Sequence, residues 1–419
     1  MEEIIRFLNH WWREGNVRKS LAKEYKRIYF NQLVNLLDKR QIIVICGLRR
    51  VGKSTLMYQL IRYLIKNKKI NPLHIFYFSF DKKVCGIKEI LDVYSKITEK
   101  DYEKENIFVF LDEIYKLENW YEELKLLYDN LPQVKFIISG SASLKIEREA
   151  RKNLTGRAFY IEIKPLSFKE FFELKTGEKL KNIKLWEDKL KILFSGFLEK
   201  PFPEIVNFSK EEVIEYIKDL VLDKILFSDF PKTFKNVDID LLQSLTEIFF
   251  SNPGNYLNIE SLSRDLRKSK NSIIFHIKLL ELGYLIRIVK NYRGSMLSAS
   301  RKLRRVYPYH PSLIQGIFKE VEESKLIECF VRAHLDAEFY WREGKKEVDF
   351  VINKIPVEVK YKESIQPKDY KNLIEFMEKF KVNKGYIISK NEFKKIFVNK
   401  KEIEIFPAWR FALMKNYEN

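Results

Sequence analysis

Cysteine, proline and glycine are scarce in this sequence. Only three of the 419 residues are cysteine, at positions 46, 85 and 329. These spacings match no metal-binding or disulfide pattern, so we expect a reducing, cytoplasmic location. No stretch approaches the roughly 18 apolar residues of a membrane span, and no membrane partner is expected. The N-terminal MEEIIRFLNHWWREG is acidic at once and lacks an uninterrupted apolar core, so a signal peptide is not expected either.

Positive charge, in contrast, is abundant. The chain has 77 Lys and Arg against 58 Asp and Glu, a formal net charge of +19. Such a balance favours a polyanionic partner, DNA above all. Enrichment in Lys and Glu is also a thermophile signature, so a compositional origin for part of the excess stays open. The length exceeds one ordinary core, and two to four domains are expected.

The first chemical motif lies at residues 47–55, which read GLRRVGKST. They fit the Walker A pattern G-x-x-x-x-G-K-[ST] at Gly47, Gly52, Lys53 and Ser54. A β-branched run precedes the motif and an apolar helical pattern follows it, which is the context a phosphate-binding loop requires. The glycines let successive backbone N–H groups converge on phosphate, and the next helix offers its positive end. We expect Lys53 to reach the phosphates and the Ser54 hydroxyl to bind Mg²⁺.

The second motif, FVFLDE at residues 108–113, is an apolar strand that ends in two carboxylates, as a Walker B strand does. Beside a phosphate site, Asp112 can hold Mg²⁺ through the Ser54 hydroxyl and water shell. Glu113 can polarise the attacking water as a general base. A third stretch, SGSAS at 139–143, ends the next strand. Its small hydroxyls could reach the γ-phosphate, but an ordinary Ser-rich turn explains it equally well.

Strands and helices alternate through this part of the chain, which predicts a parallel sheet covered on both faces. Two helices are expected before the first strand, within residues 1–40, with their aromatic residues used for packing. The expected strands cover residues 42–45, 74–80, 107–111, 134–139 and 159–163.

Four segments together resemble one family. DEIYKLENWYEELKLLYD (112–129), ISGSAS (138–143), LTGRAF (154–159) and PLSFKEFF (165–172) are similar to archaeal and bacterial AAA-type ATPases that carry a C-terminal nuclease-like domain. The resemblance runs over nearly the whole chain. It implies an α/β fold, with a P-loop NTPase parallel sheet in the order 5-1-4-3-2.

The resemblance also implies roles for individual residues. ATP and Mg²⁺ would be bound by Gly47, Arg50, Gly52, Lys53, Ser54 and Thr55, with Asp112 and Glu113 as the acidic pair. Ser139 or Ser141 would stand at the sensor position. Arg157 would meet the γ-phosphate in cis or across a subunit boundary of a homo-oligomer. A surface ion pair is an equally good explanation of Arg157.

The chain beyond the ATPase core divides into three further segments. The expected domains are 1–164, the ATPase core with its N-terminal helices; 165–236, a helical lid; 237–308, a winged helix; and 309–419, a nuclease-like domain. In the third segment, helices at 241–250, 259–266 and 271–282 precede a strand pair at 284–289 and 303–307. The third helix leaves Lys268, Lys270, Asn271, His276 and Lys278 more exposed, and RKLRR (301–305) adds charge for phosphate contacts. An equal alternative is that this segment contacts only proteins.

The last segment holds a second cluster of chemically active residues. Glu328 lies in an amphipathic helix at 324–335, Asp349 on the second strand of a hairpin, and Glu358 and Lys360 on the next strand. Residues i and i+2 of a strand share one face, so Glu358 and Lys360 project together. Such carboxylates suit a second divalent metal, Mg²⁺ or Mn²⁺, held by Asp349 and Glu358, for phosphodiester hydrolysis. Lys360 would orient the attacking water or stabilise the transition state.

The spacing of these residues, an Asp followed about nine residues later by Glu-x-Lys, resembles that of the PD-(D/E)XK nuclease fold, an α/β restriction-nuclease-like domain. Glu328 matches the helix carboxylate of that fold, although Val348 replaces the usual proline before the acidic residue. The leading interpretation is an ATP-hydrolysing enzyme that acts on nucleic acid and carries a metal-dependent nuclease. The alternative is a nucleotide-switched scaffold that binds DNA or protein and has a catalytically silent C-terminal domain.

Overall fold

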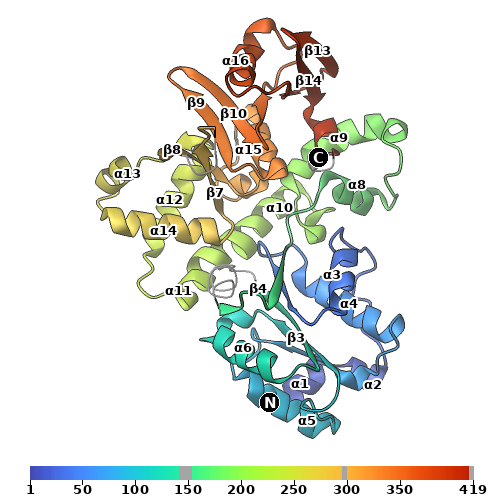
Figure 1. The fold of residues 1–419 in the computed structure, drawn as a ribbon. Helices are drawn as coiled ribbons and strands as arrows, with labels where there is room; N and C mark the ends of the chain where they lie inside the picture. Colours follow the sequence, from blue (N-terminus) through green and yellow to red (C-terminus); the bar gives the residue numbers. More distant parts are fainter. Residues whose placement is uncertain (141–152, 295–299, 415–419) are drawn as a thin grey trace. The chain divides into compact units, whose positions relative to one another are not determined.

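A computed structural model describes residues 1–140, 153–294 and 300–414 of the chain (Figure 1). It divides into two compact units, which are described separately. Unit 1 comprises Met1–Pro165 and Phe202–Glu204, and unit 2 comprises Leu166–Pro201 and Ile205–Asn419. The predicted boundaries after residues 236 and 308 fall inside unit 2, and the division into four domains stays a prediction. In the described residues, no helix is both long and apolar enough to cross a membrane.

Unit 1 is built on a five-stranded parallel sheet in the order β2-β3-β4-β1-β5, which confirms the predicted 5-1-4-3-2 order. Figure 1 shows α3 and α4 on one side of the sheet and α6 on the other. The elements are α1 (Glu2–Leu8), α2 (Trp11–Glu14), α3 (Phe30–Leu37), β1 (Ile42–Cys46), α4 (Lys53–Lys66), β2 (Ile75–Ser79), α5 (Ile87–Thr98), β3 (Ile107–Asp112), α6 (Trp120–Asn130), β4 (Val134–Gly140) and β5 (Ala158–Glu162).

The strands of this sheet form because their sequences are apolar on both faces. Every residue of β1, β2 and β4 is buried, as expected for parallel strands covered by helices on both sides. The prediction for the first forty residues was wrong in its helix count, since three helices form there rather than two.

The N-terminal helices cover the open edge of the sheet at β2. The side-chain amide of Asn9 donates to the Tyr77 carbonyl at 2.8 Å and accepts from the Tyr77 N–H at 2.7 Å, as a neighbouring strand would. The indole N–H groups of Trp11 and Trp12 both donate to the Ile75 carbonyl, at 3.1 and 2.9 Å. Polar backbone groups at this edge therefore find partners in side chains.

Unit 2 combines helices with a nine-stranded mixed sheet in the order β13-β14-β12-β11-β10-β9-β7-β8-β6. Its helices are α8 (Phe168–Thr176), α9 (Glu187–Glu199), α10 (Lys210–Ile217), α11 (Phe230–Thr233), α12 (Ile239–Ser251), α13 (Ile259–Asp265), α14 (Lys270–Leu282), α15 (Glu323–Leu335), α16 (Lys371–Lys379) and α17 (Ala408–Phe411). Its strands are β6 (Asn255–Tyr256), β7 (Ile286–Asn291), β8 (Ser300–Pro308), β9 (Phe339–Glu343), β10 (Lys346–Ile352), β11 (Ile355–Val359), β12 (Lys384–Ser389), β13 (Lys394–Val398) and β14 (Lys401–Pro407).

Strands from both sides of residue 308 share this sheet. β7 pairs in parallel with β9, so that Asn291 lies opposite Tyr340. The Asn291 side chain extends the pairing, because its amide donates to the Arg342 carbonyl at 3.0 Å and accepts from the Arg342 N–H at 2.9 Å. The segment predicted as a winged helix is therefore continuous with the sheet that carries the C-terminal carboxylates.

Candidate functional site

The loop between β1 and α4 wraps around the side chain of Lys53. Gly52 precedes the helix at a φ of 96°, which glycine adopts without strain, and Lys53 is the first helical residue. The Lys53 ammonium donates to the carbonyls of Gly47 and Leu48, both at 3.1 Å. Burial lowers the pKa of Lys53, and the carboxylates of Glu113 and Asp112 oppose that shift. The loop thus holds a buried cation among backbone groups.

Asp112 ends β3 beside this loop and is held by three hydroxyl groups. Its Oδ2 accepts from the Ser54 hydroxyl at 2.7 Å and from the Tyr77 hydroxyl at 2.8 Å, and its Oδ1 from the Ser139 hydroxyl. The Asp112 side chain is buried. Burial first, and then the charge of Asp112, raise the pKa of Tyr77 far above its usual range, so this phenol stays a donor. The carboxylate therefore has a fixed orientation toward Ser54.

Tyr77 was not among the predicted site residues. Its hydroxyl reaches Asp112 because β2 lies next to β3, and the sequence of β2, IFYFS, shows only an apolar strand. Strand order alone would have provided a signal, since it places β2 beside the acidic strand.

Glu113 follows Asp112 directly, outside the strand. Its φ of 55° is a left-handed conformation that is uncommon for a residue with a side chain. Its backbone N–H donates to the Ser139 hydroxyl at 3.4 Å, and the same hydroxyl contacts Asp112. Such unfavourable backbone conformations cluster at functional sites, where surrounding contacts fix them. Ser139, one of the two predicted sensor residues, is thus bonded to both members of the acidic pair.

The other predicted nucleotide-binding residues lie in different surroundings. Thr55 is half-buried in the first turn of α4, and Arg50 lies 3.5 Å from the Glu204 carboxylate. The Arg157 guanidinium forms two hydrogen bonds with Asp129, at 2.7 and 3.0 Å, so a role at a γ-phosphate would require that pair to open. Ser141 lies outside the described residues.

The C-terminal cluster comes together in unit 2 on one side of its sheet. The Asp349 carboxylate accepts from the Val359 N–H at 2.8 Å, and the Asp349 N–H donates to the Glu358 carboxylate at 3.3 Å. The Lys360 ammonium lies 2.5 Å from Glu358 Oε1. Burial and then the charge of Asp349 raise the pKa of Glu358 to about 8, while Lys360 opposes the shift. Asp349 and Glu358 therefore lie within reach of one another.

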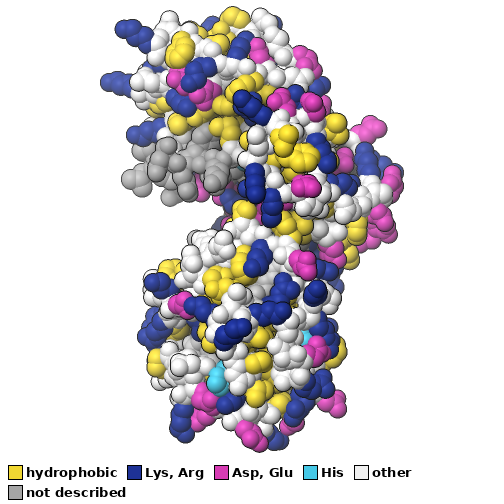
Figure 2. Space-filling model, turned by 90° about the vertical axis from the view of Figure 1, so that its right-hand side faces the viewer, with side chains coloured by type: hydrophobic (Ala, Val, Ile, Leu, Met, Phe, Trp, Pro, Cys, Tyr) yellow, Lys and Arg dark blue, Asp and Glu magenta, His cyan; other side chains and the backbone are white. Residues whose placement is uncertain are grey.

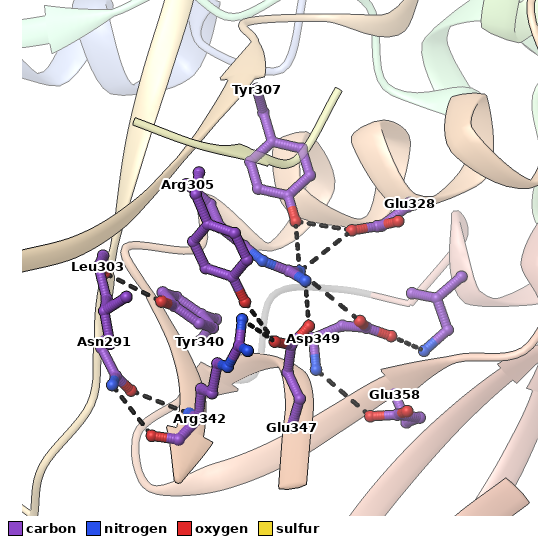
Figure 3. A network of polar contacts seen from close by, with 12 residues as sticks. Asn291, Leu303, Arg305, Tyr307, Glu328, Tyr340, Arg342, Glu347, Asp349 and Glu358 are labelled. Carbon is purple, nitrogen blue, oxygen red and sulfur yellow. Dashed lines mark hydrogen bonds and ion pairs between the residues drawn. The ribbon is translucent and has the colours of Figure 1, made fainter. Parts of the chain in front are cut away.

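Glu328 joins the cluster from α15, together with a residue that the sequence analysis assigned elsewhere (Figure 3). Glu328 Oε1 accepts from the Tyr307 hydroxyl at 2.6 Å and lies 3.4 Å from Arg305 Nη1. The same Nη1 lies 3.9 Å from Asp349 Oδ1, and Arg305 Nη2 pairs with Glu347. Burial opposes the charge of Arg305, but Tyr307 and the three carboxylates outweigh it and raise the pKa of the guanidinium.

Two predictions about the basic segment were wrong. Arg305 is directed into the carboxylate cluster with only 12% of its side chain exposed, so it is not a surface phosphate contact. His276 is buried, not exposed, because its Nε2 accepts from the Asp238 N–H at 2.8 Å and its Nδ1 lies 2.8 Å from the Ser272 carbonyl. The remaining polar residues predicted on this helix, Lys270, Asn271 and Lys278, are exposed.

No group of three His, Cys, Asp or Glu residues within 1–140, 153–294 and 300–414 is arranged to hold a metal ion. The positive charge of the chain is also dispersed on the face drawn in Figure 2, where Lys and Arg side chains are spread over both units among acidic ones. Metal binding at the C-terminal cluster and DNA binding both stay predictions.

Comparison with known families divides the chain in three. Residues 39–172 match the model of a family described as "AAA domain". Residues 201–321 and 325–411 each match a domain of unknown function, DUF8612 and DUF4143. Two uncharacterized proteins of Methanocaldococcus jannaschii are 28% and 26% identical, covering 94% and 91% of this chain and 92% and 89% of their own lengths. An uncharacterized Haemophilus influenzae protein is 29% identical over 63% of this chain and 66% of its own.

Solved structures give only a distant likeness. A signal transduction ATPase with a tetratricopeptide repeat sensor, from Pyrococcus horikoshii, has a TM-score of 0.29 at 13% identity, covering 85% of this chain and 48% of that one. The Drosophila origin recognition complex bound to DNA and Cdc6 has a TM-score of 0.23 at 12% identity, covering 74% of this chain and 95% of that one. This chain thus spans about half the length of the Pyrococcus horikoshii protein. TM-scores this low support no conclusion about function.

The strand order, the loop around Lys53 and the hydrogen bond between Ser54 and Asp112 agree with the family match. Residues 39–172 therefore match an AAA domain in sequence and have a P-loop fold, and that family implies an ATPase that uses ATP, typically with Mg²⁺.

Proposed function

We propose that this chain binds ATP with Mg²⁺ at the loop around Lys53 and hydrolyses it with Glu113 as general base. The observation that carries the proposal is the 2.7 Å hydrogen bond from the Ser54 hydroxyl to Asp112. It brings together two oxygen donors, the ligand type that Mg²⁺ prefers. When bound, Mg²⁺ would neutralise charge on the β- and γ-phosphates.

The protein groups have separate tasks in this proposal. The Lys53 ammonium is bonded to carbonyls of its own loop, so phosphate oxygens can replace those acceptors without moving the cation into a new environment. Tyr77 and Ser139 keep the Asp112 carboxylate oriented. Glu113, fixed through its backbone by Ser139, would accept the proton of the attacking water.

Replacing Lys53 by Ala tests nucleotide binding. We expect ATP affinity to fall by at least about tenfold, because a buried cation facing the phosphates is lost. Binding of a fluorescent ATP analogue, titrated with the full chain, measures the effect. Lys66→Ala is the matched control, since Lys66 is exposed in the last turn of the same helix. Equal affinities for the Lys53→Ala variant and the original chain would exclude this site for ATP.

We further propose that the chain acts on nucleic acid and that α14 contributes to the contact surface. The proposal is supported by the net charge of +19 and by the exposed Lys270, Asn271 and Lys278 on α14. The exposed Ile274 and Phe275 lie on the same helix and favour the alternative, a surface used for protein contacts. The salt dependence of DNA affinity distinguishes a nucleic-acid surface from a protein-contact surface, because contacts with phosphates release counterions.

DNA affinity should fall steeply with salt if this proposal is correct. Replacing Lys270 and Lys278 together by Ala should reduce the slope of log K against log salt by about 2, one for each lysine. Fluorescence anisotropy with a labelled duplex at several salt concentrations measures the slope. The control removes two exposed lysines from another part of unit 2, Lys181 and Lys184. An affinity that does not change with salt would contradict a nucleic-acid partner.

Two roles stay open for the C-terminal cluster. Convergence of Glu328, Asp349 and Glu358 with Lys360 supports the metal-dependent nuclease. The pairing of these carboxylates with cations of the chain itself, Arg305 and Lys360, supports a catalytically silent domain in a nucleotide-switched scaffold. We favour the second role for the arrangement described, because each of the three carboxylates already faces a cation of the chain.

A further inference from the structure

We propose that Arg305 occupies a latent divalent-cation site between Glu328 and Asp349, and that the site binds metal only when this guanidinium withdraws. The inference rests on the proposed C-terminal cluster and names how that cluster is regulated. It does not depend on ATP hydrolysis in unit 1.

The position of Arg305 Nη1 is the first observation. One nitrogen lies 3.4 Å from Glu328 Oε1 and 3.9 Å from Asp349 Oδ1, so these carboxylates of α15 and β10 face the same cation (Figure 3). Carboxylate oxygens are the ligands that hard divalent cations prefer. A metal ion and the Arg305 guanidinium cannot both occupy the space between these two carboxylates. Two positive charges a few ångströms apart would repel strongly where water is limited.

The second observation is that surrounding side chains hold the Arg305 guanidinium in place. Its guanidinium lies 5.1 Å from the ring centre of Tyr340 and 5.5 Å from that of Tyr256, within the range of cation–π attraction. Glu347 pairs with Arg305 and accepts a 2.5 Å hydrogen bond from the Tyr256 hydroxyl. The side chain is therefore held by groups that have no part in the carboxylate cluster itself.

The third observation is that Arg305 and one of the groups that hold it, Tyr256, come from a different part of the chain than the carboxylates. Arg305 is on β8 and Tyr256 on β6, both within the segment predicted as a winged helix. Gly254, at a φ of 85°, brings this segment so close that a Cβ there would lie 3.1 Å from Glu328 Oε1. β6 and β8 pair with each other, with Tyr256 opposite Arg305, so a joint movement of the two strands would withdraw the cation and uncover Glu328 together.

Manganese binding tests the proposal. Free Mn²⁺ is measured by electron paramagnetic resonance during titration of the full chain without nucleotide, so that the ATP site contributes little. Arg305→Gln alone takes one cation away from three half-buried carboxylates, Glu328, Glu347 and Asp349, and would destabilise unit 2. The main variant is therefore Arg305→Gln with Glu347→Gln, which removes both partners of one ion pair and keeps Glu328, Asp349 and Glu358. Circular dichroism confirms that the variant is folded.

We expect the double variant to bind Mn²⁺ at least about tenfold more tightly than the original chain. Adding Asp349→Asn should abolish the gain, and Arg264→Gln, which removes an exposed arginine of α13, should produce none. Equal Mn²⁺ affinity for the original chain and the double variant would overturn the proposal, and so would a gain that survives Asp349→Asn. Tight binding without cleavage of DNA or RNA would leave it standing and count against the nuclease role.

Discussion

Replacing Glu113 by Gln is expected to lower the rate of ATP hydrolysis by a factor of about 10² to 10⁴. The amide has nearly the shape of the carboxylate but cannot accept a proton from water. ATP affinity should change little, because the contacts of Lys53, Ser54 and Asp112 remain. Steady-state phosphate release gives the rate, and a nucleotide titration gives the affinity.

Glu122→Gln provides the control for this change. Glu122 is exposed in the first turn of α6, so its replacement alters the charge equally without touching the acidic pair. If the Glu113→Gln variant hydrolysed ATP at the original rate, Glu113 could not be the base. A parallel loss of affinity would instead indicate that the substitution disturbs the loop around Lys53.

The second large effect is expected from Gly47→Ala. A Cβ at Gly47 would lie 2.3 Å from the Ile163 carbonyl oxygen, a backbone atom that cannot move away alone. The φ of 142° adds strain for any residue with a side chain. We expect unit 1 to lose about 3 kcal/mol or more of unfolding free energy and ATP binding to fall with it.

Urea unfolding followed by a fluorophore in unit 1 measures this loss. Gly156→Ala is the matched control, because Gly156 also has a positive φ, 77°, but a Cβ there meets no atom within 4 Å. It should cost about 1 kcal/mol. If the two variants were equally stable, close packing of the loop against residue 163 could not be what requires glycine at position 47.

Much of unit 1 could be predicted because its signals are local. β1 is apolar throughout and β3 is apolar up to Asp112, and the loop glycines have positive φ values that glycine adopts without strain. Tyr77 could not be identified in the same way. Its role depends on the Asp112 carboxylate in the neighbouring strand, 35 positions away, and nothing in its own surroundings distinguishes it from a packing aromatic.

The basic run at 301–305 shows the opposite difficulty. A cluster of arginines predicts a solvated surface, but consecutive residues of a strand face opposite sides. Arg305 and Tyr307 are two residues apart and therefore lie on the same side of β8. On that side Arg305 contacts Glu328 of α15 and Asp349 of β10. The partners of a buried cation are set by topology, so the sequence indicated that the carboxylates converge with Lys360 but not that Arg305 joins them.

The contacts of Asn9, Trp11 and Trp12 with β2 also have a consequence for self-association. An uncovered edge strand can recruit an identical strand from a second molecule, which joins two sheets into one or seeds aggregation. Here the outward-facing groups of Ile75 and Tyr77 are already bonded to side chains of the same chain. Copies of this protein therefore cannot assemble by adding a strand at β2 without first displacing the N-terminal helices.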